Sequence, residues 1–341
     1  MAEHTLEHRG GIRALNMYES GIPMQRRAAV VIAPAEAGFR LDAWLAARFT
    51  YHSRNQWQAC IRDGAILVNG RTAKTAVTLH KGDTVDYLLP PHDEPPVDTD
   101  YRVAHEDAIL ILIDKPGNLP CHPAGPYFRH SLWHLLHQQL PEFWIINRLD
   151  RETSGLVLIA RTRESAAELS CQFQEHTVRK EYLVLVEGEF PNAVEAAGYL
   201  VADAESLVRK KRRLVNRGEA DSDYAETWME RVAAGGGLSL VRALPRTGKR
   251  HQIRATLWSL GYPVVGDKIY GCDDAHYLAF VNGSLTPSQR TALRMDRQAL
   301  HAHGLTIRQC HGQGSLTVTA PLPADFEAIL RQHAIKTQPA P

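Results

Sequence analysis

The sequence has few cysteines and no long apolar segment. Its five cysteines lie far apart along 341 residues, none belongs to a C-x-x-C pair, and their number is odd. This pattern argues against a disulfide framework and a zinc knuckle, and reduced thiols in a cytoplasmic protein fit it best. No apolar run approaches the roughly 20 residues that a membrane helix needs. The first 27 residues lack the apolar core of a secretory signal, and they contain Met17 and Met24 as alternative starts.

A strong charge of one sign is also missing. The chain has 39 Lys and Arg against 38 Asp and Glu, so its net charge is 39 − 38 = +1. A generic polyanion binder is usually more basic than this, so any binding to nucleic acid must depend on local patches. The stretch from Val208 to Arg217 holds six Lys and Arg and no acid. Such a run is usually a solvated face, and in a protein that binds nucleic acid it favours phosphate contacts.

The 17 histidines are scattered and form no obvious metal-binding set. His301 and His303 are the closest pair, and an H-x-H pattern in a strand places both side chains on one face. No third ligand lies near them in sequence, so we expect no metal site.

The pattern of residues predicts two domains. Residues 1–38 show no clear period and are expected to be an extension. Residues 39–89 predict a small unit: helices over 41–49 and 53–61, the second capped by Ser53 and ended by Gly64, then strands around an Asn69-Gly70 hairpin turn. Residues 90–105 are rich in proline and acid and predict a stiff linker. Residues 106–335 form the second domain, and 336–341 are a tail.

The second domain alternates strand-like and helical segments, which predicts an α+β fold around a large sheet. The expected strands cover residues 108–113, 156–159, 182–186, 238–243 and 316–319. The expected helices cover residues 131–139, 163–174 and 252–260.

The motif with the most information is a polar loop, Asn147-Arg148-Leu149-Asp150-Arg151-Glu152-Thr153-Ser154-Gly155-Leu156. It enters a buried strand, and Gly155 permits a tight backbone. From spacing alone, Asp150 is more simply a turn or cap aspartate. The segment resembles, however, the H-R-L-D-x-x-T-S-G-L signature of the RluA-like family of RNA pseudouridine synthases. The resemblance implies that Asp150 is the catalytic carboxylate and that Arg148 fills the gap left by the flipped base. Asn147 stands where the family has His.

Three further segments resemble family motifs in the same order. The first, Lys115-Pro116-Gly117-Asn118 with Cys121-His122-Pro123, approaches the active site, and its Asn118 replaces a glycine whose left-handed backbone Asn tolerates. The second, around Lys180 and Tyr182, implies that Tyr182 packs against the target base. The third, Thr247-Gly248-Lys249-Arg250-His251-Gln252-Ile253-Arg254, implies that Arg254 pairs with Asp150. Lys249, Ala255 and Thr256 depart from this family pattern. The resemblance implies further substrate-binding roles for Thr153, Lys115, His122, Lys180, His251 and Gln252.

Residues 39–89 resemble the small RNA-binding domain first described in ribosomal small-subunit protein four. The segment carries seven Lys and Arg against four Asp and Glu. The candidate RNA-binding residues are those of this unit and of the basic run: Arg40, Arg54, Arg62, Lys210, Lys211, Arg212 and Arg213.

Together the resemblances imply a pseudouridine synthase fold, with a large mixed and mainly antiparallel sheet preceded by a small α/β RNA-binding domain. They imply a cytoplasmic, monomeric isomerase acting on structured rRNA or tRNA. Because isomerisation adds no atoms, we expect no cofactor. One alternative is a non-catalytic RNA-binding or RNA-folding protein on the same scaffold. Another is a glycosidase or nucleosidase, which the absence of a second carboxylate paired with Asp150 in sequence disfavours.

Overall fold

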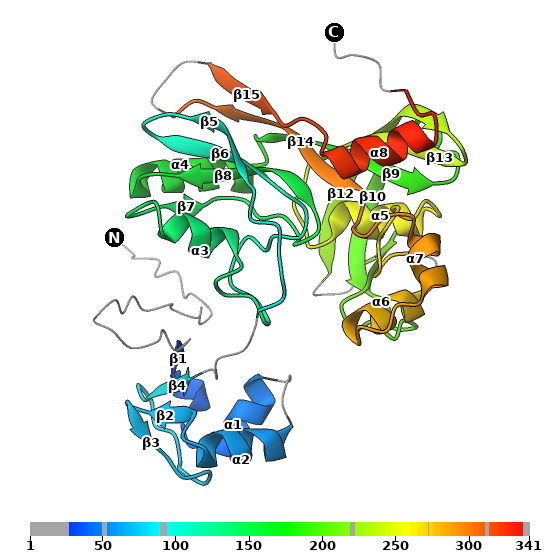
Figure 1. Cartoon of the computed structure of the whole chain (residues 1–341). Coiled ribbons are helices and arrows are strands. Elements are labelled where there is room, and N and C mark those ends of the chain that lie inside the picture. The colour runs from blue at the N-terminus through cyan, green and yellow to red at the C-terminus, as the bar shows by residue number, and fades with distance from the viewer. Residues whose placement is uncertain are drawn as a thin grey trace. The chain divides into compact units, whose positions relative to one another are not determined.

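The computed structural model describes residues 27–49, 53–88, 94–218, 222–271, 273–310 and 314–336. The expected tail beyond residue 336 and the first 26 residues lie outside these ranges. The chain divides into two compact units, residues 1–93 and 94–341 (Figure 1). No described helix is long and apolar enough to cross a membrane. Among the described cysteines, Cys60, Cys121, Cys171 and Cys310 are free thiols.

The first unit has a four-stranded antiparallel sheet in the order β1-β4-β2-β3, with two helices packed on it. Its elements are β1 (Arg27–Val31), η1 (Pro34–Glu36), α1 (Leu41–Arg48), α2 (Arg54–Arg62), β2 (Ile66–Val68), β3 (Arg71–Thr72) and β4 (Thr84–Leu88). The predicted helix cap is confirmed, because Ser53 and Gln56 form a capping box. The predicted hairpin turn is also confirmed: Asn69 and Gly70 both have positive φ and join β2 to β3.

One prediction about this unit is wrong in part. Residues 27–38 were expected to belong to an extension, but β1 pairs with β4 along its whole length, from Arg27 opposite Leu88 to Val31 opposite Thr84. Ile32, which follows β1, is 1% exposed and belongs to the core. The β-branched Val30 and Val31 favour an extended backbone in the second half of this strand.

The second unit is built on an 11-stranded sheet in the order β11-β10-β12-β13-β9-β14-β8-β6-β5, with β15 paired to β14 and β7 to β8. All pairs are antiparallel except β14 with β8, so the mixed, mainly antiparallel sheet is confirmed. The strands are β5 (Arg102–Glu106), β6 (Leu110–Lys115), β7 (Trp144–Ile145), β8 (Ser154–Ala160), β9 (Arg179–Glu187), β10 (Ala193–Ala202), β11 (Arg212–Val215), β12 (Asp223–Gly235), β13 (Leu238–Pro245), β14 (Leu300–Arg308) and β15 (Ser315–Thr319).

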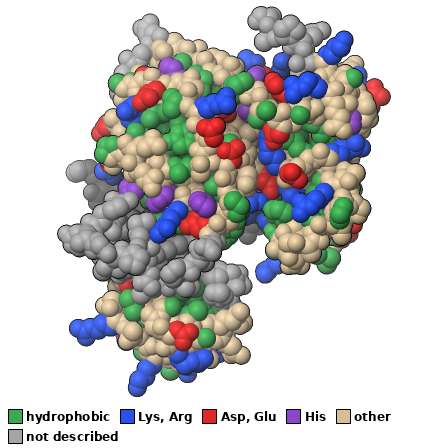
Figure 2. All heavy atoms as spheres, in the orientation of Figure 1, with side chains coloured by type: hydrophobic (Ala, Val, Ile, Leu, Met, Phe, Trp, Pro, Cys, Tyr) green, Lys and Arg blue, Asp and Glu red, His purple; other side chains and the backbone are tan. Residues whose placement is uncertain are grey.

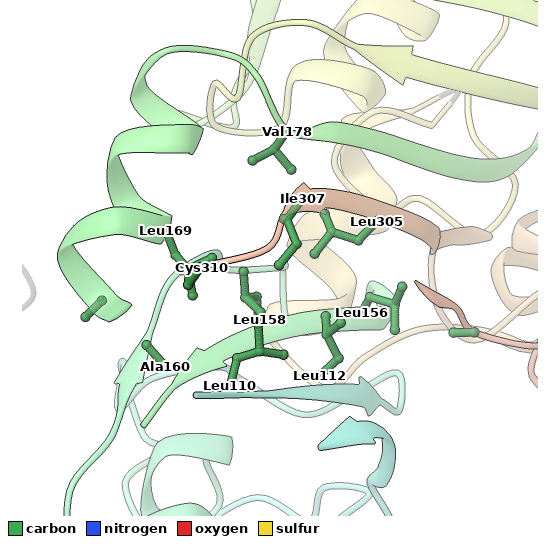
Figure 3. Close-up of a cluster of buried hydrophobic side chains, with 12 residues drawn as sticks. Leu110, Leu112, Leu156, Leu158, Ala160, Leu169, Val178, Leu305, Ile307 and Cys310 are labelled. Carbon is green, nitrogen blue, oxygen red and sulfur yellow. The ribbon is translucent and has the colours of Figure 1, made fainter. Parts of the chain in front are cut away.

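The helices of this unit cover both faces of the sheet (Figure 1). They are α3 (Leu132–His137), α4 (Arg163–Gln174), α5 (Gln252–Ser259), α6 (Asp274–Val281), α7 (Pro287–Leu293) and α8 (Ala324–Gln332). Alternate residues of β6 and β8 separate the two layers: Leu112 and Leu158 pack with Leu169 of α4, whereas Ile113 packs with Leu136 of α3 on the other face. Figure 3 shows the α4 side, where leucines of β6, β8 and β14 meet.

The strands β9 and β13 are sandwiched in the same way at the other half of the sheet. Val184 packs with Leu257 of α5, and Leu185 packs with Phe326 of α8 on the opposite face. The helix α5 is therefore fixed against the centre of the sheet, and its first turn carries the last three residues of the T-G-K-R-H-Q-I-R motif, Gln252, Ile253 and Arg254.

The C-terminal part of the expected linker, residues 94–105, is not a linker in the structure. β5 begins at Arg102, and Glu94 accepts hydrogen bonds from the backbone N–H groups of residues 128–130 at 2.8–2.9 Å. A carboxylate that collects three N–H donors holds the backbone in place. Residues 94–105 therefore pack as part of the second unit, and residues 90–93 lie outside the described ranges.

Candidate active site

Asp150 lies in the loop between β7 and β8, and neighbouring segments fix the backbone of this loop. The amide of Leu119 donates to the carbonyl of Arg151 at 3.0 Å, and Thr153 N–H donates to the carbonyl of Asp150 at 3.1 Å. Gly155 has φ of 108°, and a side chain there would overlap the carbonyl of Ala302. The predicted need for glycine at this position is thus confirmed.

Asn147 has a structural role at the start of this loop. Its Oδ1 accepts from the amide of Leu158 at 2.7 Å, and its Nδ2 donates to the carbonyl of Leu156 at 3.3 Å. One amide side chain thereby ties the loop to β8 through both of its polar atoms. Asn147 departs from the family pattern, and both polar atoms of its side chain form hydrogen bonds here.

The carboxylate of Asp150 is joined to a buried chain of charges. Arg254 on α5 donates from Nη1 to Oδ2 of Asp150 at 2.6 Å, the contact that the resemblance implies. The other edge of the same guanidinium holds Asp267, with Nε to Oδ2 at 2.6 Å and Nη2 to Oδ1 at 2.8 Å. Asp267 is fully buried and also accepts from the amides of Ile269 and Tyr270. The planar fork of Arg is suited to this bridging geometry.

The charges around Asp150 keep it ionised. Burial raises the pKa of this carboxyl, but the surrounding charges and hydrogen bonds, the guanidinium of Arg254 first among them, together lower the pKa to about 2. The Asp150 side chain is 32% exposed, whereas that of Arg254 is 5% exposed. The carboxylate therefore faces the open space while its counterion stays inside the protein.

A cavity of about 460 Å³ lies over this ion pair. Of the candidate residues, it is lined by Asp150, Arg254, Tyr182, Arg148, Thr153, Lys180, His251 and Gln252. Burial, and then the nearby Asp150 carboxylate, raise the pKa of Tyr182 to about 12, so its hydroxyl stays neutral. A ring, a carboxylate and an exposed arginine thus border one space large enough for a small ligand.

Two predicted substrate-binding residues lie outside the cavity lining. Lys115 is fully buried, and its Nζ donates to the carbonyls of Pro116 at 2.7 Å and Arg151 at 3.3 Å. It therefore holds the loop that contains Asp150 and has no exposed atom for a substrate. His122 is exposed and does not line the cavity. The prediction that Lys115 contacts the substrate directly is therefore wrong, because its side chain is fully buried.

Gln252 lines the cavity, but its amide is already used by the protein. Its Oε1 accepts from Thr247 Oγ1 at 2.8 Å and from Lys249 N–H at 2.9 Å. Its Nε2 donates to the carbonyl of Glu226 and to Thr227 Oγ1. The side chain therefore fixes the turn before α5, so the structure favours a scaffold role over the predicted substrate contact. Lys180 also supports this turn, because its Nζ donates to the carbonyl of Thr247 at 2.9 Å.

The departures from the family pattern fit their surroundings. Asn118 has φ of 62°, as expected for a residue that replaces glycine. Ala255 is fully buried in a cluster with Leu200 and Tyr270, and Lys249 approaches Asp223 at 3.4 Å. His301 and His303 both contact the carbonyl of Ala320, at 3.2 and 2.8 Å, so this pair ties β14 to the residue that follows β15.

The candidate RNA-binding residues divide by exposure. Lys211 is buried, pairs with Asp274 at 2.7 Å and lies over the ring of Trp258, so its prediction as an RNA contact is wrong: its charge is used inside the protein. Lys210 lies over Tyr277. Arg213 is exposed, as is Arg62, and Arg212 is half-buried. Figure 2 shows positive and negative side chains interleaved on the visible face of the molecule.

Arg40 and Arg54 in the first unit share one buried acid. Both donate to Asp42, at 3.1 and 3.0 Å, and Asp42 is fully buried. About half of each arginine side chain is exposed. Neutralising Asp42 is thus one role of these arginines, and their exposed parts leave them able to contact a phosphate.

The sequence reasoning assigned no role to several residues that build the site. Asp267 lies in the segment Gly261–Asp267, which also resembles a family segment, but that resemblance implies no role for Asp267. Gln298 donates to Thr153 Oγ1 at 2.6 Å, and Lys268 donates to Glu152 at 2.9 Å. The signal for Asp267 was its place in that segment; for Gln298 and Lys268 the sequence holds no signal that separates them from ordinary polar residues.

Both units of the chain match known protein families. Residues 109–259 match the family described as RNA pseudouridylate synthase, and residues 39–85 match the S4 domain. The chain is 33% identical to an uncharacterised RNA pseudouridine synthase of Synechocystis sp. over 82% of this chain and 92% of the relative. It is 30% identical to ribosomal large subunit pseudouridine synthase D of Nitrosomonas europaea, over 89% and 86%. It is 31% identical to the mitochondrial tRNA pseudouridine(32) synthase of Saccharomyces cerevisiae, over 64% and 47%.

A solved structure shows the same fold. Human RNA Pseudouridylate Synthase Domain Containing 4 superposes with a TM-score of 0.53 at 23% identity, covering 69% of this chain and 93% of that one. The fold and the matches define an RNA-modifying enzyme with an N-terminal S4 domain. The chain belongs to the RNA pseudouridine synthase family, and it is an isomerase that converts uridines in RNA to pseudouridine.

Proposed function

We propose that Asp150 is the catalytic carboxylate of this enzyme and that its target is a specific uridine of rRNA or tRNA, flipped into the cavity. The observation that carries this proposal is the position of Asp150: an ionised carboxylate on the cavity wall, held by an arginine that is itself buried. A carboxylate that reacts with a ribose must stay ionised in a partly desolvated site. Arg254 supplies the charge that makes this possible.

The reaction needs no external reagent. The bond between ribose C1′ and uracil N1 breaks, the ring turns over, and uracil C5 bonds to C1′ while its proton is released and N1 gains one. Asp150 either attacks the ribose or removes a proton from it. The target nucleotide must leave its stack, which costs a few kcal/mol. Tyr182 would then pack against the flipped base, and Arg148, exposed at the cavity edge, would fill the gap in the RNA.

We assign a different role to each of the two units. Residues 39–89 would bind RNA through exposed arginines such as Arg62, and residues 106–335 would carry the reaction. Arg212 and Arg213 on β11 would contact phosphates beside the cavity. These contacts would be sequence-independent and would weaken with added salt.

The substrate class is tested with purified protein and transcripts that carry tritium at uracil C5. Pseudouridine formation releases this tritium from the modified position. We expect release from full-length large-subunit rRNA or from a tRNA transcript, up to one equivalent per target site. Release from neither transcript set would contradict the proposed substrate class.

Tyr182 should act through its ring and not through its hydroxyl. Base stacking on an aromatic side chain contributes about 1–3 kcal/mol, so Tyr182→Leu should slow single-turnover tritium release by roughly 5- to 150-fold. Tyr182→Phe keeps the ring and should stay within about threefold of wild type. A Phe variant as slow as the Leu variant would show that the hydroxyl takes part, contrary to this role.

Replacing Lys211 should affect stability, whereas replacing Arg213, two residues further along the chain, should affect RNA binding. Lys211→Ala removes the charged partner of Asp274 and should lower the free energy of unfolding by about 1.5–3 kcal/mol, with the salt dependence of RNA affinity unchanged. Arg213→Ala should change the free energy of unfolding by no more than about 0.5 kcal/mol. It should reduce by about one the slope of the logarithm of RNA affinity against the logarithm of salt concentration. If only Lys211→Ala weakened the salt dependence of RNA affinity, then Lys211 and not Arg213 would be the phosphate contact.

We infer further that the protein works as a monomer in the cytoplasm. The free thiols among the described cysteines support a reducing compartment. Light scattering of the RNA complex should give one protein chain for each RNA, and a mass corresponding to two chains would contradict the monomer.

A further inference from the structure

His251 stands beside Asp150 in the cavity wall. It precedes α5 with a left-handed backbone, φ 57°, and its side chain is 7% exposed. Its Nε2 lies 3.8 Å from Oδ1 of Asp150, which is beyond hydrogen-bond distance. Among the described residues Nε2 has no hydrogen-bond partner, whereas Nδ1 is 3.0 Å from the hydroxyl of Tyr270. One ring nitrogen is therefore held by the protein and the other is available to a ligand.

The hydroxyl of Tyr270 decides which nitrogen carries the proton. Tyr270 is fully buried, and its oxygen already accepts from the backbone N–H of Arg212 at 3.2 Å. Among the described residues, Nδ1 of His251 is the acceptor within reach for the hydroxyl proton. If Nδ1 carried the proton, the buried hydroxyl would be left without an acceptor, which is costly. Tyr270 therefore donates to Nδ1, and a neutral His251 carries its proton on Nε2.

The surroundings also keep His251 neutral. Burial lowers the pKa of the imidazole, and the Arg254 guanidinium lowers it further, to about 4, although the Asp150 carboxylate opposes this shift. Arg250 is a further neighbouring charge that lowers the pKa. At neutral pH the ring is then a hydrogen-bond donor of fixed direction and carries no charge that would compete with Arg254 for Asp150.

We propose that His251, in the tautomer set by Tyr270, donates a hydrogen bond from Nε2 to a carbonyl oxygen of the flipped uracil. This inference rests on the proposed function, because it takes the cavity as the uracil site. When the C1′–N1 bond breaks, its electron pair moves onto the uracil ring and the negative charge spreads to O2 and O4. A preorganised neutral donor at one of these oxygens stabilises that charge. His251 keeps its proton throughout, and Tyr270 is a positioning residue.

The tautomer is testable on the free protein. Long-range ¹⁵N–¹H correlation spectra of the full chain labelled at histidine should show His251 at pH 7 as the neutral Nε2–H form, with its resonances assigned by loss in His251→Gln. In Tyr270→Phe the two neutral tautomers should mix. A cationic ring or an Nδ1–H form in the wild type would overturn the proposal. This result does not depend on Asp150 being catalytic.

Kinetics test the donor itself. Single-turnover tritium release should fall about 100-fold in His251→Leu, with RNA affinity within about twofold, because removal of one such donor costs about 10²–10³ in rate. His251→Gln places an amide N–H near the position of Nε2 and should recover at least about tenfold of that loss. Tyr270→Phe should lie between the Leu variant and the wild type.

His105→Leu, on the edge strand β5, is the matched control and should react at the wild-type rate. Equal rates for His251→Leu and wild type would overturn the proposal, and so would equal rates for the Gln and Leu variants when both are folded by thermal unfolding. Should Asp150→Asn retain activity while His251 shows the expected tautomer, the proposed role of Asp150 would fail and the tautomer assignment would stand.

Discussion

Replacing Asp150 by Asn should stop pseudouridine formation while the RNA still binds. Asn has nearly the same size and can still accept a hydrogen bond from Arg254, but it can neither attack the ribose nor take its proton. Loss of an acid–base group alone costs 10²–10⁴-fold, so we expect single-turnover tritium release to fall by at least about 10³-fold. RNA affinity, measured by filter binding, should stay within about threefold of wild type.

The control for this variant is Glu195→Gln, which neutralises an exposed carboxyl on β10. It should react like the wild type. Because the pKa of Asp150 is about 2, the carboxylate protonates only as the pH falls towards that value, so the wild-type rate should show no decline from this group between pH 8 and pH 5. Turnover by Asp150→Asn near the wild-type rate would remove Asp150 from the mechanism.

Replacing Arg254 by Met should damage both the fold and the activity. It leaves Asp267 fully buried without its counterion and removes the partner that keeps Asp150 ionised. Breaking a buried ion pair by removing one partner costs about 3–5 kcal/mol. Hydrogen-exchange mass spectrometry should show this loss in peptides of β9, β13 and α5, while peptides of the first unit are unchanged. Activity should fall at least as far as in Asp150→Asn.

A double variant separates the two effects. Arg254→Met with Asp267→Asn removes the uncompensated buried charge, so protection of α5 should recover in part, whereas activity should not. Arg254→Lys retains the charge but lacks the planar fork that reaches both carboxylates, and it should therefore remain slow. Recovery of activity in the double variant would show that Arg254 is needed only for folding.

The sequence predicted the parts of the fold that depend on local rules. Ser53 caps α2, Asn69-Gly70 makes the hairpin, and Asn118 takes the left-handed backbone, because each of these depends on a few adjacent residues. It predicted β8 and α4 for the same reason. The strand β12 was not predicted, since Glu226, Glu230 and other polar residues on its outer face obscure the inward alternation of Ala225, Thr227 and Met229.

The candidate site was predictable only as far as the resemblance reached. Asp150 and Arg254 were paired from their motifs, 104 residues apart, and the structure places them 2.6 Å from each other. The second carboxylate on Arg254 is a tertiary feature that depends on how the turn after α5 folds back. The charge of Lys211 was misread because a run of basic residues does not show which side chain turns inward to meet Asp274.

Catalysis by Asp150 is tested most directly by pseudouridine mapping across total RNA from cells that lack this gene. We expect at least one pseudouridine to disappear from rRNA or tRNA. The wild-type gene should restore it, and the Asp150→Asn gene, expressed at the same level, should not. An unchanged map in the cells without the gene, or restoration by Asp150→Asn, would contradict this expectation.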